Sequence, residues 1–385
     1  MSILGIRLHN QKNRSNFAAV TYSPFCIVKF IRQSFLLFAL WTGMPLVAQI
    51  YGAGSSVYSF LGLPGSSRLA ALGGENVAIQ DGEITSALIN PSLLSGTTHH
   101  ALSLNYGYHL KGTMGGVAMY GYNFRRSSLE KQVEEDDRPN RFAAAIHFMD
   151  YGKMPYASAD GTLTGGEFTA KDILIDLVYA RQLGPMFTVG VSLKPVMSFY
   201  ERYSSFALAA DVGGHFQTKD SLLHIGLAFR NIGWQLKGFY TREGGQQREQ
   251  LPFNLELGLS YRVKHAPLRF SVTIHNMQRW NLDYEFTNQP RDTKTKVEWY
   301  DMMFRHTVFA LDIIPKSERF YLTVSYNHRH RAEMQLKDQR SLAGFALGAG
   351  VRIKMLRLGI AMSQYTKSNL AFNASLSMDI NQLLK

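Results

Sequence analysis

The sequence predicts an all-β protein: a transmembrane antiparallel β-barrel of about fourteen strands with an N-terminal plug segment in the lumen. Three observations predict this fold. Apolar and polar residues alternate in many segments beyond residue 100. The face opposite the apolar one carries mostly Gly, Ser, Ala, Thr and Asn, not the charges that a water-exposed sheet surface needs. Long and short connections alternate along most of the chain, as they do in outer-membrane barrels.

The predicted strands follow a two-residue period, which places every second side chain on one face. In "ALSLNYGYHL" this period puts Leu102, Leu104 and Tyr106 on the same face. Each segment is about long enough to cross a bilayer at a tilt. Because lipid offers no water to edge amides, such a sheet must close into a ring. The predicted strands lie near 101–110, 114–124, 141–151, 171–183, 186–198, 203–216, 221–233, 253–264, 267–276, 304–315, 319–330, 341–353, 356–365 and 369–380.

Two further patterns belong to this prediction. Every second connection is long and polar, and the connections between them are short; the long ones are 152–170, 234–252, 277–303 and 331–340. Two exceptions break this alternation. The connection 199–202 is short but lies on the long-loop side, and the first two connections have the reverse order of lengths. Aromatic side chains near strand ends suit the girdles of a lipid-facing surface. These aromatic residues are Tyr106, Tyr108, Tyr120, Tyr122, Phe124, Tyr200, Tyr203 and Tyr321.

Residues 1–48 have the features of a cleavable signal peptide. The apolar run "FLLFALWTGMPLVAQ" follows Lys29 and Arg32 and reaches the small residues Val47-Ala48. A buried core helix is the alternative interpretation of the apolar run. The first ~20 residues make the charged region longer than a signal peptide needs, which an upstream start site would explain. The single cysteine, Cys26, lies in this region, so the exported chain is expected to form no disulfide. Beyond residue 48 the chain has 36 basic and 29 acidic residues, and this mild excess does not indicate a nucleic-acid-binding protein.

Residues 49–98 precede the first strand and are predicted to form the plug. They contain two helix-like stretches, Ser67–Leu72 after a capping serine and Thr85–Leu94, which is interrupted by Asn90-Pro91. A ring of about fourteen strands leaves a lumen too wide for side chains alone to fill. A periplasmic tail or an extra strand is the alternative. The plug motif consists of Leu63, Pro64, Arg68, Gly73, Gly74, Asn90 and Pro91, and residues 99–385 form the predicted barrel.

The sequence contains no convincing catalytic, cofactor-binding or metal-binding pattern, so no enzymatic activity is expected. Ser128–Lys131 matches Ser-x-x-Lys without its companion motifs. His99 and His100 would point to opposite faces of a strand, and His328 and His330 share a face without a third ligand. The acidic run Glu134–Asp137 lacks the spacing of a calcium loop.

A basic group stands near one end of the predicted strands 319–330 and 341–353. On the loop pattern this end faces outward, and we hypothesise that it contacts an acidic polysaccharide or a partner protein. A solvated rim is the alternative. The group consists of His328, Arg329, His330, Arg331 and Arg340.

Several long motifs carry a resemblance to a known family. They include "YSFLGLPGSSRLAALGGENVAIQDGEITSALINPSLL", "IHFMDYGKM", "GEFTAKDILIDLVYARQLGP" and "YNHRHRAEMQLKDQRSLAGFALGAGVRIK". Over about residues 57–380 the chain resembles the PorQ family of the type IX secretion system, which are FadL-like outer-membrane barrels of Bacteroidota.

This resemblance implies a plugged fourteen-strand barrel in the outer membrane of a Gram-negative cell. It also implies that the protein anchors a PorZ-like surface protein and works with the PorU/PorV attachment machinery. The alternative function is a passive channel for small hydrophobic molecules, as in the wider FadL family.

Overall fold

The computed structural model describes residues 58–110, 112–124, 139–158, 160–240, 245–282, 297–334, 342–366 and 369–380. The predicted signal peptide, the Ser128–Lys131 motif, the Glu134–Asp137 run and Arg340 lie outside these residues. Among the helices in the described ranges, none has both the length and the apolar character required to span a membrane.

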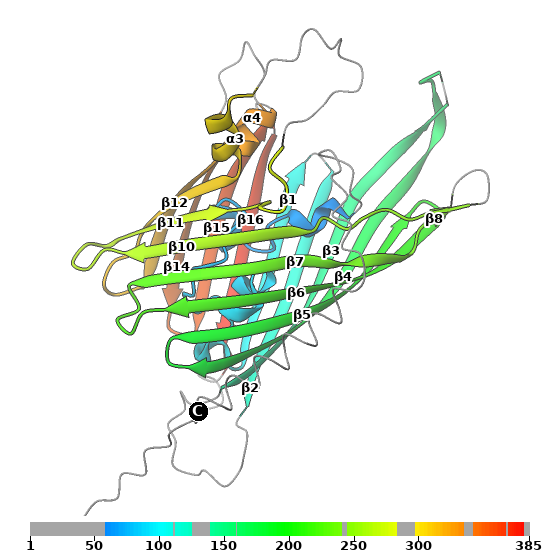
Figure 1. Ribbon diagram of the computed structural model, residues 1–385. Helices are drawn as coiled ribbons and strands as arrows, with labels where there is room; N and C mark the ends of the chain where they lie inside the picture. The colour runs from blue at the N-terminus through cyan, green and yellow to red at the C-terminus, as the bar shows by residue number, and fades with distance from the viewer. Residues whose placement is uncertain are drawn as a thin grey trace, which may run out of the picture. The chain divides into compact units, whose positions relative to one another are not determined.

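Fourteen antiparallel strands form one sheet that closes on itself, with β1 paired to β16 (Figure 1). This confirms the predicted fold class and strand number. Each strand otherwise pairs with its neighbours in the chain, except that β7 pairs with β10 across a loop that holds the small β8–β9 sheet. The strands are β1 (Ala101–Leu110), β2 (Thr113–Phe124), β3 (Asn140–Ala157), β4 (Leu163–Gly184), β5 (Phe187–Tyr200), β6 (Tyr203–Gln217), β7 (Leu223–Lys237), β8 (Phe239–Tyr240), β9 (Gln246–Gln247), β10 (Asn254–Arg262), β11 (Leu268–Ile274), β12 (Thr307–Ile313), β13 (Phe320–Asn327), β14 (Phe345–Ile353), β15 (Leu356–Thr366) and β16 (Asn369–Asp379).

Burial alternates along the strands as the two-residue period predicts. In β4, Ile173 and Leu177 are exposed, whereas Asp172 and Asp176 between and beside them are fully buried. Large apolar side chains therefore cover the outer surface, whereas the buried inward positions carry polar and mostly small apolar side chains. The same outer surface carries Tyr106, Tyr120, Tyr122 and Phe124 among its exposed aromatic residues.

Two of the predicted girdle residues instead face the lumen. The Tyr200 hydroxyl donates to buried Asp172 at 3.1 Å. The Tyr321 ring lies 4.4 Å from the guanidinium carbon of Arg68 in the plug. Assigning these tyrosines to the lipid face was therefore wrong, because each has a charged partner inside the ring.

The connection expected at 152–170 is mostly strand. β3 continues to Ala157, and β4 begins at Leu163, so that Lys153 pairs with Thr169. The neighbouring strands pair only as far as Asp150 on one side and Ala170 on the other. The β3–β4 hairpin consequently projects beyond its neighbours as a two-stranded ribbon (Figure 1).

Two short helices replace the strand ends expected near residues 304 and 330. Helix α3 (Trp299–Arg305) precedes β12, and helix α4 (His328–Met334) follows β13 directly. The Asn327 side chain accepts a hydrogen bond from the backbone N–H of His330 at 3.1 Å, which is the geometry of a helix N-cap. Local capping therefore ends the strand at Asn327, and His328 and His330 do not share a strand face.

We call the described residues 58–98 the plug segment. It contains η1 (Ser59–Gly62), α2 (Ser67–Ala71), η2 (Ile84–Leu88), η3 (Pro91–Leu93) and η4 (Gly96–Thr98). Ser66 caps α2 by accepting from the N–H of Leu69, as the sequence suggested. The helix-like stretch expected at Thr85–Leu94 is two short 3₁₀ helices, with the break at Asn90-Pro91 that the sequence indicates, because Asn90 has an extended backbone and its side chain accepts from the N–H of Ser92.

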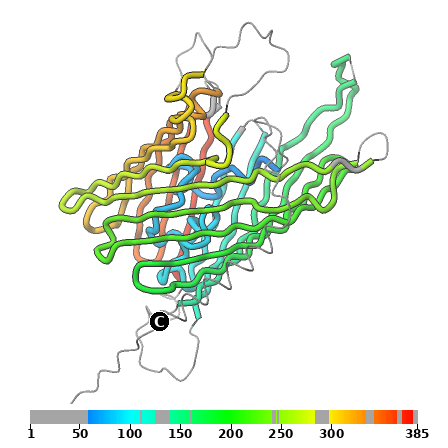
Figure 2. The backbone as a smooth tube through the Cα atoms, in the orientation of Figure 1, coloured from blue at the N-terminus to red at the C-terminus, as the bar shows by residue number. Residues whose placement is uncertain are grey.

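The plug segment contacts strands on all sides of the ring. Helix α2 packs against β13–β16, η2 against β1 and β2, and η3 against β4–β6. Figure 2 shows this part of the chain, in blue, between the front and rear strands. The described part of the segment therefore lies in the lumen, and its apolar residues share hydrophobic clusters with inward-facing barrel residues.

Candidate functional site

The most concentrated polar chemistry in the described residues lies where the plug segment meets the barrel wall. Arg68 is at the centre of one cluster and is only 3 % exposed. Its guanidinium holds both carboxylate oxygens of Asp312 on β12, at 2.9 and 3.0 Å, and its Nε contacts Asp81 at 2.9 Å. Arg269 on β11 contacts the same two carboxylates. Although burial opposes the charge, the carboxylates of Asp312 and Asp81 raise the pKa of Arg68, so that it stays charged.

A second cluster joins the plug segment to β7 and β10. Arg230 contacts Glu256 at 2.7 Å and Glu75 at 3.1 Å, and it donates to the Leu61 carbonyl at 3.2 Å. Burial and the neighbouring charge of Glu256 raise the pKa of Glu75 well above its ordinary value, although Arg230 opposes this effect. Two carboxylates thus share one arginine.

A third cluster lies near β15 and β16. Glu83 accepts from the Ser377 hydroxyl at 2.6 Å and lies 3.6 Å from Arg357. Three acids within residues 75–83 therefore meet three arginines from β7, β11 and β15. The sequence patterns did not indicate these arginines as partners of the plug segment. The available signal was a charged residue at an inward position of a strand whose other inward residues are small.

Glycines on adjacent strands make room for the plug backbone. Gly190 faces Gly213 across β5–β6, and Gly226 faces Gly258 across β7–β10. A Cβ at Gly213 would lie 1.9 Å from Asn90 Oδ1, and one at Gly226 would lie 1.9 Å from the Val77 carbonyl oxygen. These positions admit no side chain while the plug segment is in place.

The seven predicted plug-motif residues have several roles. Arg68 makes the ion pairs, and Asn90 donates through Nδ2 to the Val77 carbonyl at 2.8 Å. Pro91 packs on Gly190. Gly73 and Gly74 both have positive φ and end helix α2, where the Gly74 N–H donates to the Leu69 carbonyl. Leu63 and Pro64 contribute to a cavity.

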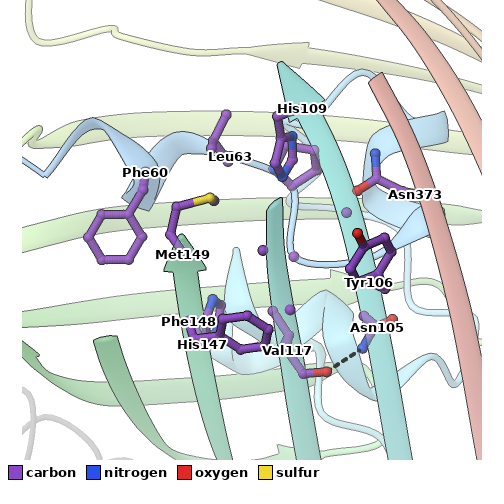
Figure 3. A pocket seen from close by; sticks show the side chains of 15 residues that line it. Phe60, Leu63, Asn105, Tyr106, His109, Val117, His147, Phe148, Met149 and Asn373 are labelled. Carbon is purple, nitrogen blue, oxygen red and sulfur yellow. Dashed lines mark hydrogen bonds between the residues drawn. The ribbon is translucent and has the colours of Figure 1, made fainter. Parts of the chain in front are cut away.

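This cavity lies between the plug segment and strands β1, β2, β3 and β16 (Figure 3). Its volume of about 30 Å³ is enough for one or two water molecules. The plug side provides Phe60, Leu63, Pro64 and Gly65, and the wall provides Val117, Met149 and several polar residues. Three glycines, at 107, 115 and 116, make the wall thin at this point.

The predicted basic rim is only partly described. His328 contacts Asp301 at 2.7 Å, and Arg329 pairs with Glu333 one helical turn later. His330 and Arg331 belong to the same helix, α4. Within the described ranges no group of three or more His, Cys, Asp or Glu side chains is placed to hold a metal ion.

Comparison with known proteins adds information on the fold. No family model matches the chain, and no curated protein matches it. Among solved structures, a deletion mutant of the TodX monoaromatic hydrocarbon channel matches with a TM-score of 0.52 and 11 % identity, over 83 % of this chain and 99 % of that one. The toluene transporter TodX of Pseudomonas putida matches with a TM-score of 0.45 and 10 % identity, over 85 % and 98 % of the two chains.

A FadL homologue of Pseudomonas aeruginosa matches with a TM-score of 0.40 and 9 % identity, over 77 % of this chain and 94 % of that one. At these identities the likeness concerns the fold alone. The closed fourteen-strand barrel thus shares its fold with the TodX deletion mutant.

Proposed function

We propose that this chain is an outer-membrane channel through which small hydrophobic molecules cross passively. The observation that carries the proposal is the shared fold with TodX, whose name describes a monoaromatic hydrocarbon channel. The apolar outer surface of the closed barrel suits a lipid environment. The cavity beside Phe60, Leu63 and Pro64 offers an apolar contact surface between plug and wall.

In the described residues this cavity is too small for a hydrocarbon ring, so passage requires the plug segment to shift. The ion pairs of Arg68 and Arg230 oppose such a shift. The ladder between β4 and β5 is interrupted between Leu174 and Leu177, opposite Pro195, which has no N–H to donate. This interruption is a weak point in the wall.

The test is uptake of a hydrophobic fluorescent probe by cells with an intact lipopolysaccharide outer membrane, with and without this chain. Expression is expected to increase the rate of probe entry. The double variant Arg68→Met and Asp312→Leu, which removes one plug attachment, is expected to increase it further. Unchanged entry in both cases would contradict the channel function.

A second function is favoured by a different observation. The plug segment is held by ion pairs to strands around the ring, of which the Arg68–Asp312 pair is buried on both sides, as expected of a barrel that serves as a membrane anchor. Together with the sequence resemblance, this supports a role in the attachment complex of a type IX secretion system. The partners would be a PorZ-like surface protein and the PorU/PorV machinery.

The two functions are separated by one experiment in the native organism. Deletion of the gene is expected to release secreted proteins from the cell surface if the barrel is an anchor, and gently solubilised membranes should yield a co-purifying surface protein. Normal surface retention with impaired entry of hydrophobic molecules would favour the channel instead.

A further inference from the structure

Helix α3 carries large apolar side chains on the side that faces away from the protein. The exposed residues are Trp299, Tyr300, Met303 and Phe304. With 3.6 residues per turn, these four positions fall within one half of the helix circumference. The charged residues of the helix, Asp301 and Arg305, are less exposed and pair with each other at 2.8 Å. A helix that borders water has the reverse arrangement, with its polar residues on the exposed side.

The other side of α3 is attached to the rest of the rim. The Asp301 carboxylate accepts a hydrogen bond from His328 Nε2 at 2.7 Å, at the start of α4. The other nitrogen of the His328 ring lies 2.9 Å from the Tyr326 hydroxyl on β13. Met302 is buried, and its sulfur lies 3.3 Å from the backbone nitrogen of Leu282. These contacts fix the rotation of α3 about its axis, so the apolar side is held outward.

The apolar side of α3 is continuous with the outer surface of the barrel. The centroid of the Phe304 ring lies 6.3 Å from that of Phe309, the first outward-facing residue of β12. Phe309 pairs with Tyr326 on β13, whose ring centroid lies 4.8 Å from that of Phe345 on β14. Figure 1 shows α3 at the end of β12, beside α4. A row of aromatic side chains therefore runs from α3 across three strands.

The residue types on this side of α3 suit a lipid surface better than a protein partner. The strands below have the same arrangement, with large apolar residues outside and polar residues inside, and their outer surface is the one that suits lipid. Trp and Tyr are enriched where a membrane meets water, because each ring is apolar and carries one polar group. The helix begins with one of each, Trp299 and Tyr300.

We propose that α3 lies on the membrane, with Trp299, Tyr300, Met303 and Phe304 in contact with the lipids of the leaflet at this end of the barrel. The helix is amphipathic and lies in the interface instead of crossing the bilayer. Its lipid contact holds the rim formed by α3 and α4 at a fixed depth. This inference goes beyond the channel and anchor functions and depends on neither of them.

The test uses the intrinsic fluorescence of Trp299 in the full chain. The chain has four tryptophans, and replacing Trp41, Trp234 and Trp280 by Phe leaves Trp299 as the only one. The variant is reconstituted into phosphatidylcholine vesicles whose acyl chains carry bromine near the headgroup, where bromine quenches a tryptophan that it contacts. Trp299 emission is expected to fall about twofold relative to vesicles without bromine, and to resist quenching by acrylamide from the water.

Two control variants place the single tryptophan elsewhere, with Trp299 also replaced by Phe. Phe309→Trp reports on the outer surface of β12 and is expected to lose emission in the brominated vesicles as Trp299 does. Leu163→Trp reports on the end of the β3–β4 hairpin. Leu163 is 66 % exposed and Trp299 is 67 % exposed, so the two sites are matched in exposure. Leu163→Trp is expected to respond to acrylamide and not to bromine.

Trp299 emission that responds to acrylamide and not to bromine would overturn the proposal. Emission that responds to neither quencher would also overturn it, because another segment or a second copy would then cover the helix. Quenching by bromine at Phe309→Trp but not at Trp299 would place the barrel in the membrane and α3 outside it. If the tryptophan replacements prevent folding, Tyr300→Cys in a Cys26→Ser chain, labelled with a polarity-sensitive fluorophore, decides through the same two quenchers.

Discussion

At the scale of single residues, Arg68 is the plug residue with the largest expected effect. Replacing it by Met leaves the buried carboxylate of Asp312 with Arg269 as its remaining cationic partner. Removal of one partner of a buried ion pair costs about 3–5 kcal/mol. Arg68→Met is therefore expected to lower the free energy of unfolding by this amount, measured by urea titration of the refolded barrel.

A matched exposed pair provides the control for Arg68. Arg262 and Glu318 form an ion pair in which Glu318 is 57 % exposed. Exposed pairs contribute about 0–1 kcal/mol, so Arg262→Met should change the unfolding free energy little. Equal effects of the two substitutions would show that the plug ion pairs do not stabilise the fold.

Gly213 provides a second residue-scale prediction. Gly213→Ala places a Cβ against Asn90 Oδ1 and forces the plug segment to move. Overpacking of this kind costs about 1–3 kcal/mol. A fall of that size in unfolding free energy is expected, with faster entry of a hydrophobic probe. Gly184→Ala is the control, because nothing lies within 4 Å of its added Cβ.

At the scale of elements, the acids of residues 75–83 make the plug attachment depend on pH. Burial raises the pKa of Glu75 and Glu83 above the ordinary value of 4.5. Their contribution to the free energy of unfolding is therefore complete below pH 4.5 and is lost as the pH rises through the raised pKa. Asp81 is also desolvated by burial, but Arg68 and Arg269 hold its pKa below the ordinary value of 3.8. Its contribution to the free energy of unfolding is therefore present above pH 3.8 and is lost as the pH falls below that value.

Thermal unfolding followed from pH 4.5 upward is therefore expected to show a declining midpoint. Glu75→Gln and Glu83→Gln should each reduce this decline of the midpoint. Asp81→Asn should change the midpoint only when the titration is extended below pH 3.8. A midpoint that is constant in the wild type, or a decline that both glutamine variants retain, would be inconsistent with these shifts.

The elements also show where local pattern and structure diverge. The run after Asn327 alternates well enough to predict a strand, yet the Asn327 side chain caps helix α4. The stretch 152–170 is rich in Gly and polar residues and predicted a loop, yet Lys153–Ala157 and Leu163–Thr169 pair with each other. In both cases a specific hydrogen-bonding partner outweighs the average preference of the segment.

At the scale of the whole molecule, the outer apolar surface predicts that the cost of an added charge depends strongly on its depth in the membrane. Ile360, in the middle of β15, and Leu163, at the end of the β3–β4 hairpin, are both 66 % exposed. Arginine at the bilayer midplane costs about 2–4 kcal/mol, and near the interface about 0–1 kcal/mol. Ile360→Arg should therefore destabilise the barrel in lipid vesicles far more than Leu163→Arg, measured by urea titration. Similar costs at both positions would contradict the proposed membrane placement.

The sequence alone predicted about fourteen strands, the inward and outward faces of most of their residues, and a helix start after Ser66 or Ser67, because these depend on two-residue periodicity and on capping within a few residues. Only the tertiary structure decided which inward residues meet. Arg68 and Asp312 are 244 positions apart, and Asn105 and Asn373 line one cavity only because β1 closes the ring against β16. A local pattern fixes the direction of a side chain, whereas its partner depends on ring closure and on the path of the plug segment through the lumen.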